Sequence, residues 1–314
     1  MNTENNLTKS PIDKENPLEL FLKCKDFTLS NETFTLLKDN KNEIVITNPQ
    51  PKLDKQSTYY DSEAYISHTD AQKTFTDKMY QKVKSFAIKK KINLVSKFYI
   101  KKSIQNSEIK ILDLGCGTGD FLLACKNKNY KVVGVEPNKN ARVLSKSKLD
   151  ILTSNYSNIN DDYPKVHETI NTIEEQFDVI TMWHVLEHVP NLKEYIAITK
   201  KLLKPEGTLI IAVPNYKSYD ATYYKEFWAA YDVPRHLWHF SKKSISLLFK
   251  KEKLKVVKII PMKFDAYYVS LLSEKYKTGK SNLFKAFFRG WLSNFKALSS
   301  KEYSSLIYIL KNDK

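Results

Sequence analysis

The sequence predicts an α/β protein built on a doubly wound sheet of seven strands, of which the last is antiparallel. From residue 106 onward, short apolar runs alternate with helical patterns, which is typical of a parallel sheet with crossover helices. A glycine-rich turn at residues 115–119 joins the first of these runs to a helical pattern. The 314 residues, 42% of them hydrophobic, are enough to bury a core of this size.

Six of the strands follow directly from the apolar runs. They are expected at residues 110–114, 131–136, 177–181, 208–213, 255–261 and 304–310. We expect the last two to pair in antiparallel fashion, with residues 263–300 between them as a helical insertion. The remaining strand is expected before the polar stretch that begins at residue 152. Ser241 has the character of an N-cap for a helix over residues 242–250.

The first third of the chain has a different pattern. Residues 1–20 are polar and are expected to form a disordered tail. Residues 21–105 read as an N-terminal extension and helical lid, with strand-like runs at 34–37 and 44–47 ahead of a lysine-rich helical segment. The main domain is then expected to occupy residues 106–314.

The composition excludes several classes of protein. The formal net charge is +16, but 48 of the 51 basic residues are lysines, and nucleic-acid readers usually depend on arginine forks. We therefore do not expect a nucleic-acid partner. The chain has no apolar run of about 18 residues and no apolar core near its start, so neither a membrane span nor a secretory signal is expected.

Cysteine usage indicates a reducing compartment. The three cysteines are an odd number and form no CxxC pair, so neither a disulfide framework nor a cysteine zinc site is encoded. Cys24 in particular has no partner cysteine in the N-terminal extension. We expect a cytoplasmic protein without structural zinc.

The glycine turn carries the strongest functional signal. Its glycines allow positive φ and a close approach of ligand to backbone, and Glu136, after the next strand, is placed to accept the hydroxyls of a ribose. The spacing is G-x-G-x-G rather than the G-x-G-x-x-G of dinucleotide sites. Asp113, just before the turn, would repel a pyrophosphate but attract an ammonium group. A ligand with a ribose at one end and an amino acid at the other fits both acids.

The sequence from about residue 105 to 262, which includes the glycine turn and both acids, resembles the class I S-adenosylmethionine-dependent methyltransferases. The run 177–190 looks like the fourth-strand motif of that family, and 202–211 resembles its turn into the fifth strand. The Leu-Glu-His-Val run at 186–189 is similar to that of quinone-biosynthesis O-methyltransferases. The resemblance implies a Rossmann-like fold and S-adenosylmethionine as cofactor. It implies that the cofactor site is lined by Asp113, Gly115, Cys116, Gly117, Gly119, Glu136, Pro137, Trp183 and His184.

The expected reaction is methyl transfer to a small-molecule acceptor, at oxygen. Such a transfer needs alignment of the nucleophile and exclusion of water, and it needs a base only where the acceptor loses a proton. His184 and His239 are the candidate catalytic groups. The alternative is that His184 only lines the adenosine site while His188 packs the helix start. Similar quinone enzymes bind a divalent metal through acids in this run, but His184 stands in place of one of them, so we predict no metal.

The loop after the fifth strand is the candidate for acceptor recognition, because ligands of open α/β sheets bind at the carboxyl ends of the strands. Its candidate residues are Tyr231, Arg235, His236 and His239. The alternative is an aromatic loop packed over the sheet, with Arg235 paired to Asp232. Related methyltransferases cover the cofactor with an N-terminal helical segment, which implies that Tyr65 and His68 belong to a lid.

An amphipathic helix is expected over residues 282–298. Six large apolar residues recur at helical spacing, with Lys285, Arg289 and Lys296 elsewhere on the helix. This helix could contact a membrane surface, cover a lipid-like or aromatic acceptor, or pack as a cap on the domain. With Tyr267 and Tyr268 it suggests a hydrophobic roof over the acceptor. A nucleic-acid methyltransferase and a non-catalytic binding module that keeps the cofactor fold remain the alternative functions.

Overall fold

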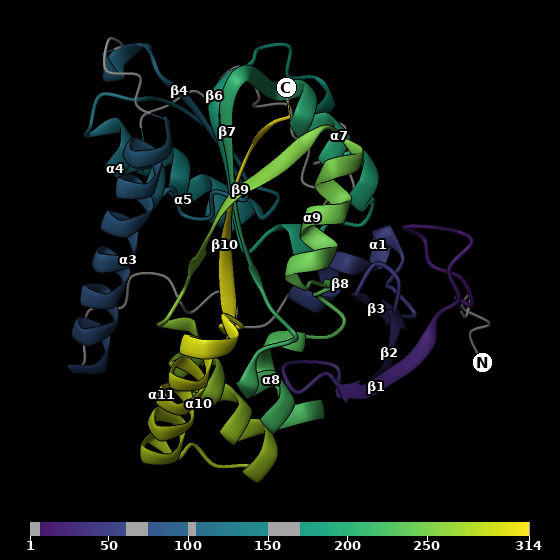
Figure 1. The fold of residues 1–314 in the computed structure, drawn as a ribbon. Helices are drawn as coiled ribbons and strands as arrows, with labels where there is room; N and C mark the ends of the chain where they lie inside the picture. The colour runs from purple at the N-terminus through teal and green to yellow at the C-terminus, as the bar shows by residue number, and fades with distance from the viewer. Residues whose placement is uncertain (1–6, 61–74, 100–104, 150–169, 314) are drawn as a thin grey trace.

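The computed structural model describes residues 7–60, 75–99, 105–149 and 170–313 (Figure 1). The strands are β1 (Glu19–Lys25), β2 (Thr33–Asp39), β3 (Ile44–Asn48), β4 (Lys110–Leu114), β5 (Lys131–Val135), β6 (Phe177–Trp183), β7 (Leu203–Pro214), β8 (Trp238–His239), β9 (Leu254–Pro261) and β10 (Ser305–Asn312). The α-helices are α1 (Leu53–Gln56), α3 (Phe75–Tyr99), α4 (Asp120–Lys126), α5 (Lys139–Leu149), α7 (Leu192–Leu202), α8 (Tyr219–Tyr224), α9 (Lys242–Lys251), α10 (Asp265–Thr278) and α11 (Leu283–Ser300).

The central sheet has the strand order β5-β4-β6-β7-β10-β9. The first four strands are parallel, and β10 runs antiparallel between β7 and β9, so the doubly wound sheet with an antiparallel last strand is confirmed. The expected number of seven strands is wrong for the described residues, which form six. The remaining strand was expected just before residue 152, and residues 150–169 lie outside the described residues.

Helices cover both faces of this sheet, which explains why its strands read as nearly continuous apolar runs. Figure 1 shows α3 and α4 on one side of the sheet and α7 and α9 on the other. Val95 and Phe121 belong to the core cluster on the first side, while Ile196 and Phe249 belong to the cluster on the second. The Ser241 cap is confirmed, because its side chain and that of Ser244 form a capping box at the start of α9.

A second, smaller sheet has the order β1-β2-β3-β8 and is antiparallel. Its strands β2 and β3 contain the two runs predicted at 34–37 and 44–47, whereas β1 and β8 were not predicted. The strand β8 belongs to the loop expected to recognise the acceptor, and Val45 of β3 pairs with His239 of β8. The N-terminal extension is therefore joined to that loop by a shared sheet.

Residues 7–20 are packed against this small sheet rather than free. Ile12 is 3% exposed and lies in the core cluster that includes Ile44 and Ile46. The side-chain amide of Asn16 donates hydrogen bonds to the buried carboxylate of Asp39. The expectation of a disordered tail as far as residue 20 is wrong for these residues, because contacts with distant parts of the chain order them.

The helices α10 and α11 form an antiparallel pair beyond one end of the sheet, next to α8 (Figure 1). The aromatic side chains of α11 face solvent instead of roofing the domain. Phe284 is 91% exposed and Phe287 is 65% exposed, whereas Ala286 and Gly290 form the buried face. None of the helices that the structure describes combines the length and apolar character needed to cross a bilayer.

A buried ion-pair network connects the extension to the acceptor loop. The guanidinium of Arg235 lies 2.8 Å from a carboxylate oxygen of Asp26, just after β1, and 2.7 Å from one of Asp232. It also donates to the backbone carbonyl of Tyr59. The side chains of Arg235 and Asp26 are almost fully buried, so each charge depends on the other for compensation.

We predict that Arg235→Met lowers the free energy of unfolding by about 3 kcal/mol, because it leaves the Asp26 carboxylate buried without its cation. Lys217→Met is the matched control, since Lys217 pairs with Glu43 at 2.8 Å on a half-exposed surface. The control substitution should lower the free energy of unfolding by less than about 1 kcal/mol. Urea unfolding of both variants measures the difference, and equal losses would contradict a supporting role for the buried network.

Candidate functional site

The glycine turn lies between β4 and α4, and its backbone requires glycine. Gly115, Gly117 and Gly119 all have positive φ, at 72°, 56° and 79°. A Cβ at Gly115 would lie 2.4 Å from Val185, whereas a Cβ at Gly117 would meet no protein atom within 4 Å. The turn therefore packs against the protein on one side and borders open space at Gly117.

Two buried carboxylates flank the turn. Glu136, directly after β5, accepts hydrogen bonds from the backbone N–H groups of Gly117 at 2.7 Å and Asn138 at 2.9 Å. Burial raises the pKa of Glu136, although these two hydrogen bonds act in the opposite direction. Asp113 in β4 accepts a 2.5 Å hydrogen bond from the hydroxyl of Thr181. Burial raises the pKa of Asp113 to about 7, partly offset by Thr181.

Lys91 of α3 and Trp183 complete the surroundings of Asp113. The ammonium of Lys91 lies 4.5 Å from the centre of the Trp183 ring, and burial lowers its pKa although Asp113 and Asp265 act to raise it. The indole N–H of Trp183 is buried and has no hydrogen-bond partner in the described part of the chain. Lys91 lies near enough to Asp113 for that carboxylate to act on its pKa, and it contacts the ring that carries the free N–H. Such donors and an acid suit a ligand that carries both an ammonium and a carboxylate.

Cys116 and Pro137 lie beside the turn as predicted, but neither presents a charged group. The Cys116 sulfur is within 3.9 Å of the Ser145 hydroxyl, and burial raises the pKa of its thiol. The carbonyl oxygen of Pro137 accepts a hydrogen bond from Arg142 at 2.9 Å. The structure thus brings the predicted cofactor residues to one end of β4, β5 and β6.

His184 follows β6 in a left-handed conformation, with φ of 58°. Its Nε2 lies 3.1 Å from a carboxylate oxygen of Asp265, and its Nδ1 lies 3.3 Å from one of Glu187. Burial lowers the pKa of His184, but the hydrogen bonds and charges of Asp265 and Glu187 outweigh it and raise the pKa to about 10. In this arrangement the ring is an imidazolium at neutral pH and cannot accept a proton as a base.

A second cluster joins the 3-10 helix η4 (Leu186–His188) to the acceptor loop. The rings of His188 and His236 meet edge to face with centroids 4.5 Å apart. Ligand atoms of Glu187, His188 and His236 lie within 4.8 Å of one another, and Oε2 of Glu187 is buried with no described hydrogen-bond partner. This set has the spacing to hold a metal ion, although we expected no metal ligands from the sequence.

The backbone carbonyl oxygens beside the histidines of this cluster indicate which ring nitrogen donates a hydrogen bond. Nδ1 of His236 lies 2.9 Å from the carbonyl oxygen of Ala230, which can only accept, so Nδ1 carries a proton and the lone pair of a neutral ring would be on Nε2. Nδ1 of His188 lies 3.1 Å from the Arg235 carbonyl oxygen and 2.9 Å from the Tyr60 hydroxyl. Burial, followed by the nearby His236, lowers the pKa of His188 to about 4.

The other predicted acceptor residues are more deeply placed. Tyr231 is buried and packs against Trp228 and His239. His239 is buried with Nε2 3.0 Å from the Thr47 hydroxyl, and burial lowers the pKa of His239 well below its usual range. Arg235 pairs with Asp232, as in the alternative that the sequence left open, and also with Asp26, which the sequence did not predict. The predicted lid residues Tyr65 and His68 lie outside the described residues.

Two site residues were not predicted from the sequence. Lys91 was missed because it is one of 48 lysines and lies on a helix without a marked apolar stripe. Asp265 was missed because its partner His184 is distant in the sequence. The only local signal was an acid in the first turn of a helix, which is common in helices that have no role in a site.

Comparisons with known proteins agree with this geometry. Residues 80–259, more than half of the chain, match a family model described as a methyltransferase domain. A ubiquinone biosynthesis O-methyltransferase from Glaesserella parasuis is 35% identical over 112 residues, which are 34% of this chain and 45% of that protein. One from Saccharophagus degradans is 32% identical over 119 residues, 37% of this chain and 48% of that protein. The chain thus spans about half the length of these relatives.

The similar solved structures are more distant. A SAM-dependent methyltransferase from Archaeoglobus fulgidus is 16% identical with a TM-score of 0.47, and the match covers 76% of this chain and all of that one. The magnesium protoporphyrin IX methyltransferase from Synechocystis PCC 6803 is 12% identical with a TM-score of 0.49 over 81% of this chain and 96% of that one.

The ion pairs of His184 predict a pH-dependent stability. Because the pKa of His184 is raised from 6.5 to about 10, its stabilising contribution is complete below pH 6.5 and is lost between pH 6.5 and 10. His184→Asn tolerates the left-handed backbone but carries no charge. We expect the free energy of unfolding of the wild type to exceed that of this variant by about 1 kcal/mol at pH 6, and by less at pH 9.5. The value at pH 6 allows for solvent screening of a partly exposed group. A difference that stays constant in urea unfolding would contradict these ion pairs.

Proposed function

The chain belongs to the methyltransferase domain family, and we propose that it transfers a methyl group from S-adenosylmethionine to a hydroxyl oxygen of a small-molecule acceptor. The family match supports methyl transfer. The proteins that are most informative about the acceptor atom carry the name ubiquinone biosynthesis O-methyltransferase, which supports oxygen. An aromatic or lipid-like acceptor agrees with those names and with the aromatic loop after β7.

The observation that carries this proposal is the open space at Gly117, whose backbone N–H donates to the buried Glu136, together with the buried Asp113 on the strand that leads into the turn. Glu136 uses one lone pair of each carboxylate oxygen for a backbone N–H, so each oxygen can still accept a ribose hydroxyl. Asp113 is suited to an ammonium, and Lys91 and the Trp183 N–H are suited to a carboxylate. These are the polar groups of S-adenosylmethionine apart from its base and its sulfonium, so the residues present fit the cofactor.

The chain itself aligns the two reactants, excludes water from them and removes the proton of the acceptor hydroxyl. S-adenosylmethionine, when bound, supplies a methyl group already activated on a sulfonium. Residues of the glycine turn and Glu136 fix the cofactor against the sheet, and the neighbouring loop presents the acceptor. The ion pairs from His184 to Asp265 and Glu187 connect α10 to the end of β6, so we assign His184 a positioning role.

The proton acceptor that the geometry favours is His236. In the neutral ring its Nε2 would hold the lone pair, and Asp232 lies 3.9 Å away to stabilise the imidazolium that forms when the acceptor hydroxyl gives up its proton. His188 has its pKa lowered to about 4 and is a weaker base. His239, which the sequence offered as a catalytic group, is buried behind Thr47 and keeps the fold of the loop in this proposal.

The cofactor site is tested by two glycine variants with the same backbone. We predict that Gly117→Ala weakens S-adenosylhomocysteine binding more than tenfold, because the new methyl group fills space that the ligand needs. Gly279→Ala is the matched control, since Gly279 also has positive φ, at 72°, and open space around a Cβ. Both variants should lose about 1 kcal/mol of stability from backbone strain. If both kept full affinity in calorimetry, the ligand would not lie at Gly117.

The assignment of the base is tested with radiolabelled S-adenosylmethionine and a panel of phenols, catechols and prenylated phenols. We predict that His236→Gln lowers kcat about 100-fold with S-adenosylhomocysteine affinity unchanged, because the acceptor hydroxyl loses the group that removes its proton. His239→Gln should leave kcat close to that of the wild type. A large fall in kcat for His239→Gln with none for His236→Gln would transfer the role to His239.

A further inference from the structure

The outer face of α11 is an exposed apolar stripe. Its members are Leu283, Phe284, Phe287, Phe288, Trp291, Phe295 and Leu298, each between 46% and 91% exposed. Phe288, Trp291 and Phe295 stack on one another along the helix, with centroid distances of 5.9 and 5.4 Å. Large apolar residues scattered singly over a surface need no explanation, but a continuous stripe on one helix indicates an interaction site.

The way α11 packs on its neighbours turns this stripe outward. The buried positions of the helix are the small residues Ala286, Gly290, Ser293 and Ala297. A Cβ at Gly290 would lie 2.8 Å from the backbone of Tyr267, so the two helices approach closely through small side chains. Ser293 also donates a 2.6 Å hydrogen bond to the buried Asp220 carboxylate. The small face is therefore the one bound to the domain. On the aromatic face Phe287 stacks on Tyr267 of α10 with ring centroids 5.2 Å apart, but most of the surface of the stripe remains exposed.

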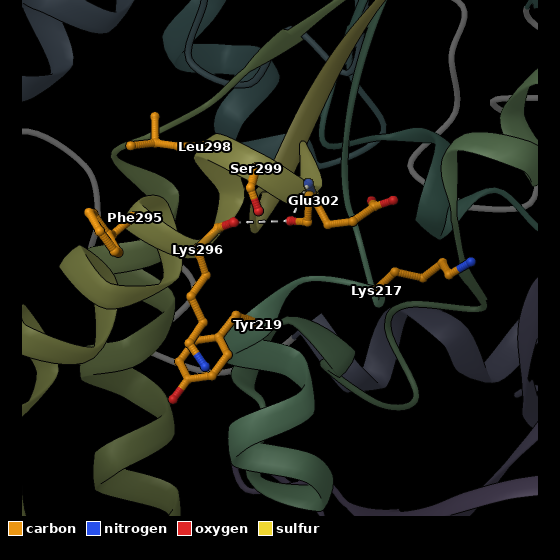
Figure 2. Close-up of a pocket in the computed structure, with 8 residues that line it drawn as sticks. Lys217, Tyr219, Phe295, Lys296, Leu298, Ser299 and Glu302 are labelled. Carbon is orange, nitrogen blue, oxygen red and sulfur yellow. Dashed lines mark hydrogen bonds between the residues drawn. The ribbon is translucent and has the colours of Figure 1, made fainter.

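The charge around the stripe is mostly positive, although the Glu274 carboxylate pairs with Lys285 at 3.1 Å and Glu302 lies at the C-terminal end of the helix. Residues 275–301, from the last turn of α10 through α11, contain seven Lys or Arg residues and no Asp or Glu. A groove of about 590 Å³ at the C-terminal end of α11 places Lys217 and Lys296 beside Phe295 and Leu298. In Figure 2 the Lys296 chain extends across the ring of Tyr219, with its ammonium 4.0 Å from the ring centre. Apolar and cationic groups thus meet along one edge of the helix.

We propose that α11 docks the protein on an anionic lipid surface, independently of the proposed reaction. The aromatic stripe would enter the interfacial region of the bilayer, and the flanking lysines would contact the negatively charged headgroups. A second copy of this chain is a poorer occupant, because a symmetric pairing of α11 would bring its three basic residues, Lys285, Arg289 and Lys296, close to the same three residues of the other copy. An acidic protein is the remaining occupant and is an outcome of the test.

The test is flotation of the full chain with vesicles of phosphatidylcholine alone or with 30% phosphatidylglycerol, at low and high salt. We expect binding to the anionic vesicles that falls at high salt and is at least tenfold weaker on neutral vesicles. The double variant Leu283→Ser/Phe284→Ser should lose at least tenfold in partitioning. Leu20→Ser/Val143→Ser is the matched control, since Leu20 and Val143 are 65% and 57% exposed on β1 and α5.

Three outcomes would overturn the proposal. Equal binding of both double variants to anionic vesicles would show that the stripe is not the contact. Absence of vesicle binding together with a concentration-dependent dimer in sedimentation velocity, abolished by the α11 variant, would assign the face to a second copy. Absence of both would leave an acidic protein as the occupant. Thermal unfolding of the two double variants should agree within about 2 °C, so that loss of binding reports on the surface and not on folding.

Discussion

The site depends on keeping two carboxylates ionisable in a place where burial opposes their charge. Glu136 is held by two backbone N–H groups, one from the glycine turn and one from the start of α5, and Asp113 is held by Thr181 on the neighbouring strand. These bonds tie the carboxyl ends of β4, β5 and β6 together. The same burial raises the pKa of both acids, so a ligand with a positive charge and hydroxyl donors would offset the cost of burying their charge.

The second constraint is the attachment of the N-terminal extension to the loop after β7. The pairing of β3 with β8 and the Arg235–Asp26 ion pair both cross between them, so the two segments fold as one unit. This unit holds His236 beside η4 and therefore beside the end of β6. The groups that we assign to the acceptor are thus positioned by a part of the chain that lies outside the parallel sheet, which leaves the sheet free to serve the cofactor.

The sequence predicted the sheet well because a parallel strand that is buried on both faces must be apolar along its whole length. It failed for β1, where exposed Leu20 and three charged residues interrupt the pattern, and for β8, which has only two residues. It identified the glycine turn because positive φ and close approach leave glycine as the main choice. It could not find Lys91, Asp265 or the packing of Ile12, because each depends on a partner that is far away in the sequence.

Contacts between residues that are distant in the sequence also determine the roles of the predicted site residues. The sequence placed His184 at the end of β6, but its function as a base or as a positioning group depends on Asp265, which arrives from α10. The histidines of the predicted acceptor loop are both buried, and their different partners, the Ala230 carbonyl for His236 and the Thr47 hydroxyl for His239, depend on contacts that the sequence does not reveal. Residue type and spacing indicate the chemistry of a site, and tertiary contacts determine which member performs it.

The most direct test of the account is calorimetric titration of the purified protein with S-adenosylhomocysteine, with NADH as the control nucleotide. The account predicts micromolar affinity for S-adenosylhomocysteine, which corresponds to about −8 kcal/mol, and no detectable heat with NADH. Absence of binding to either ligand, or a preference for NADH, would contradict the assignment of the Gly117 space and its two acids to S-adenosylmethionine.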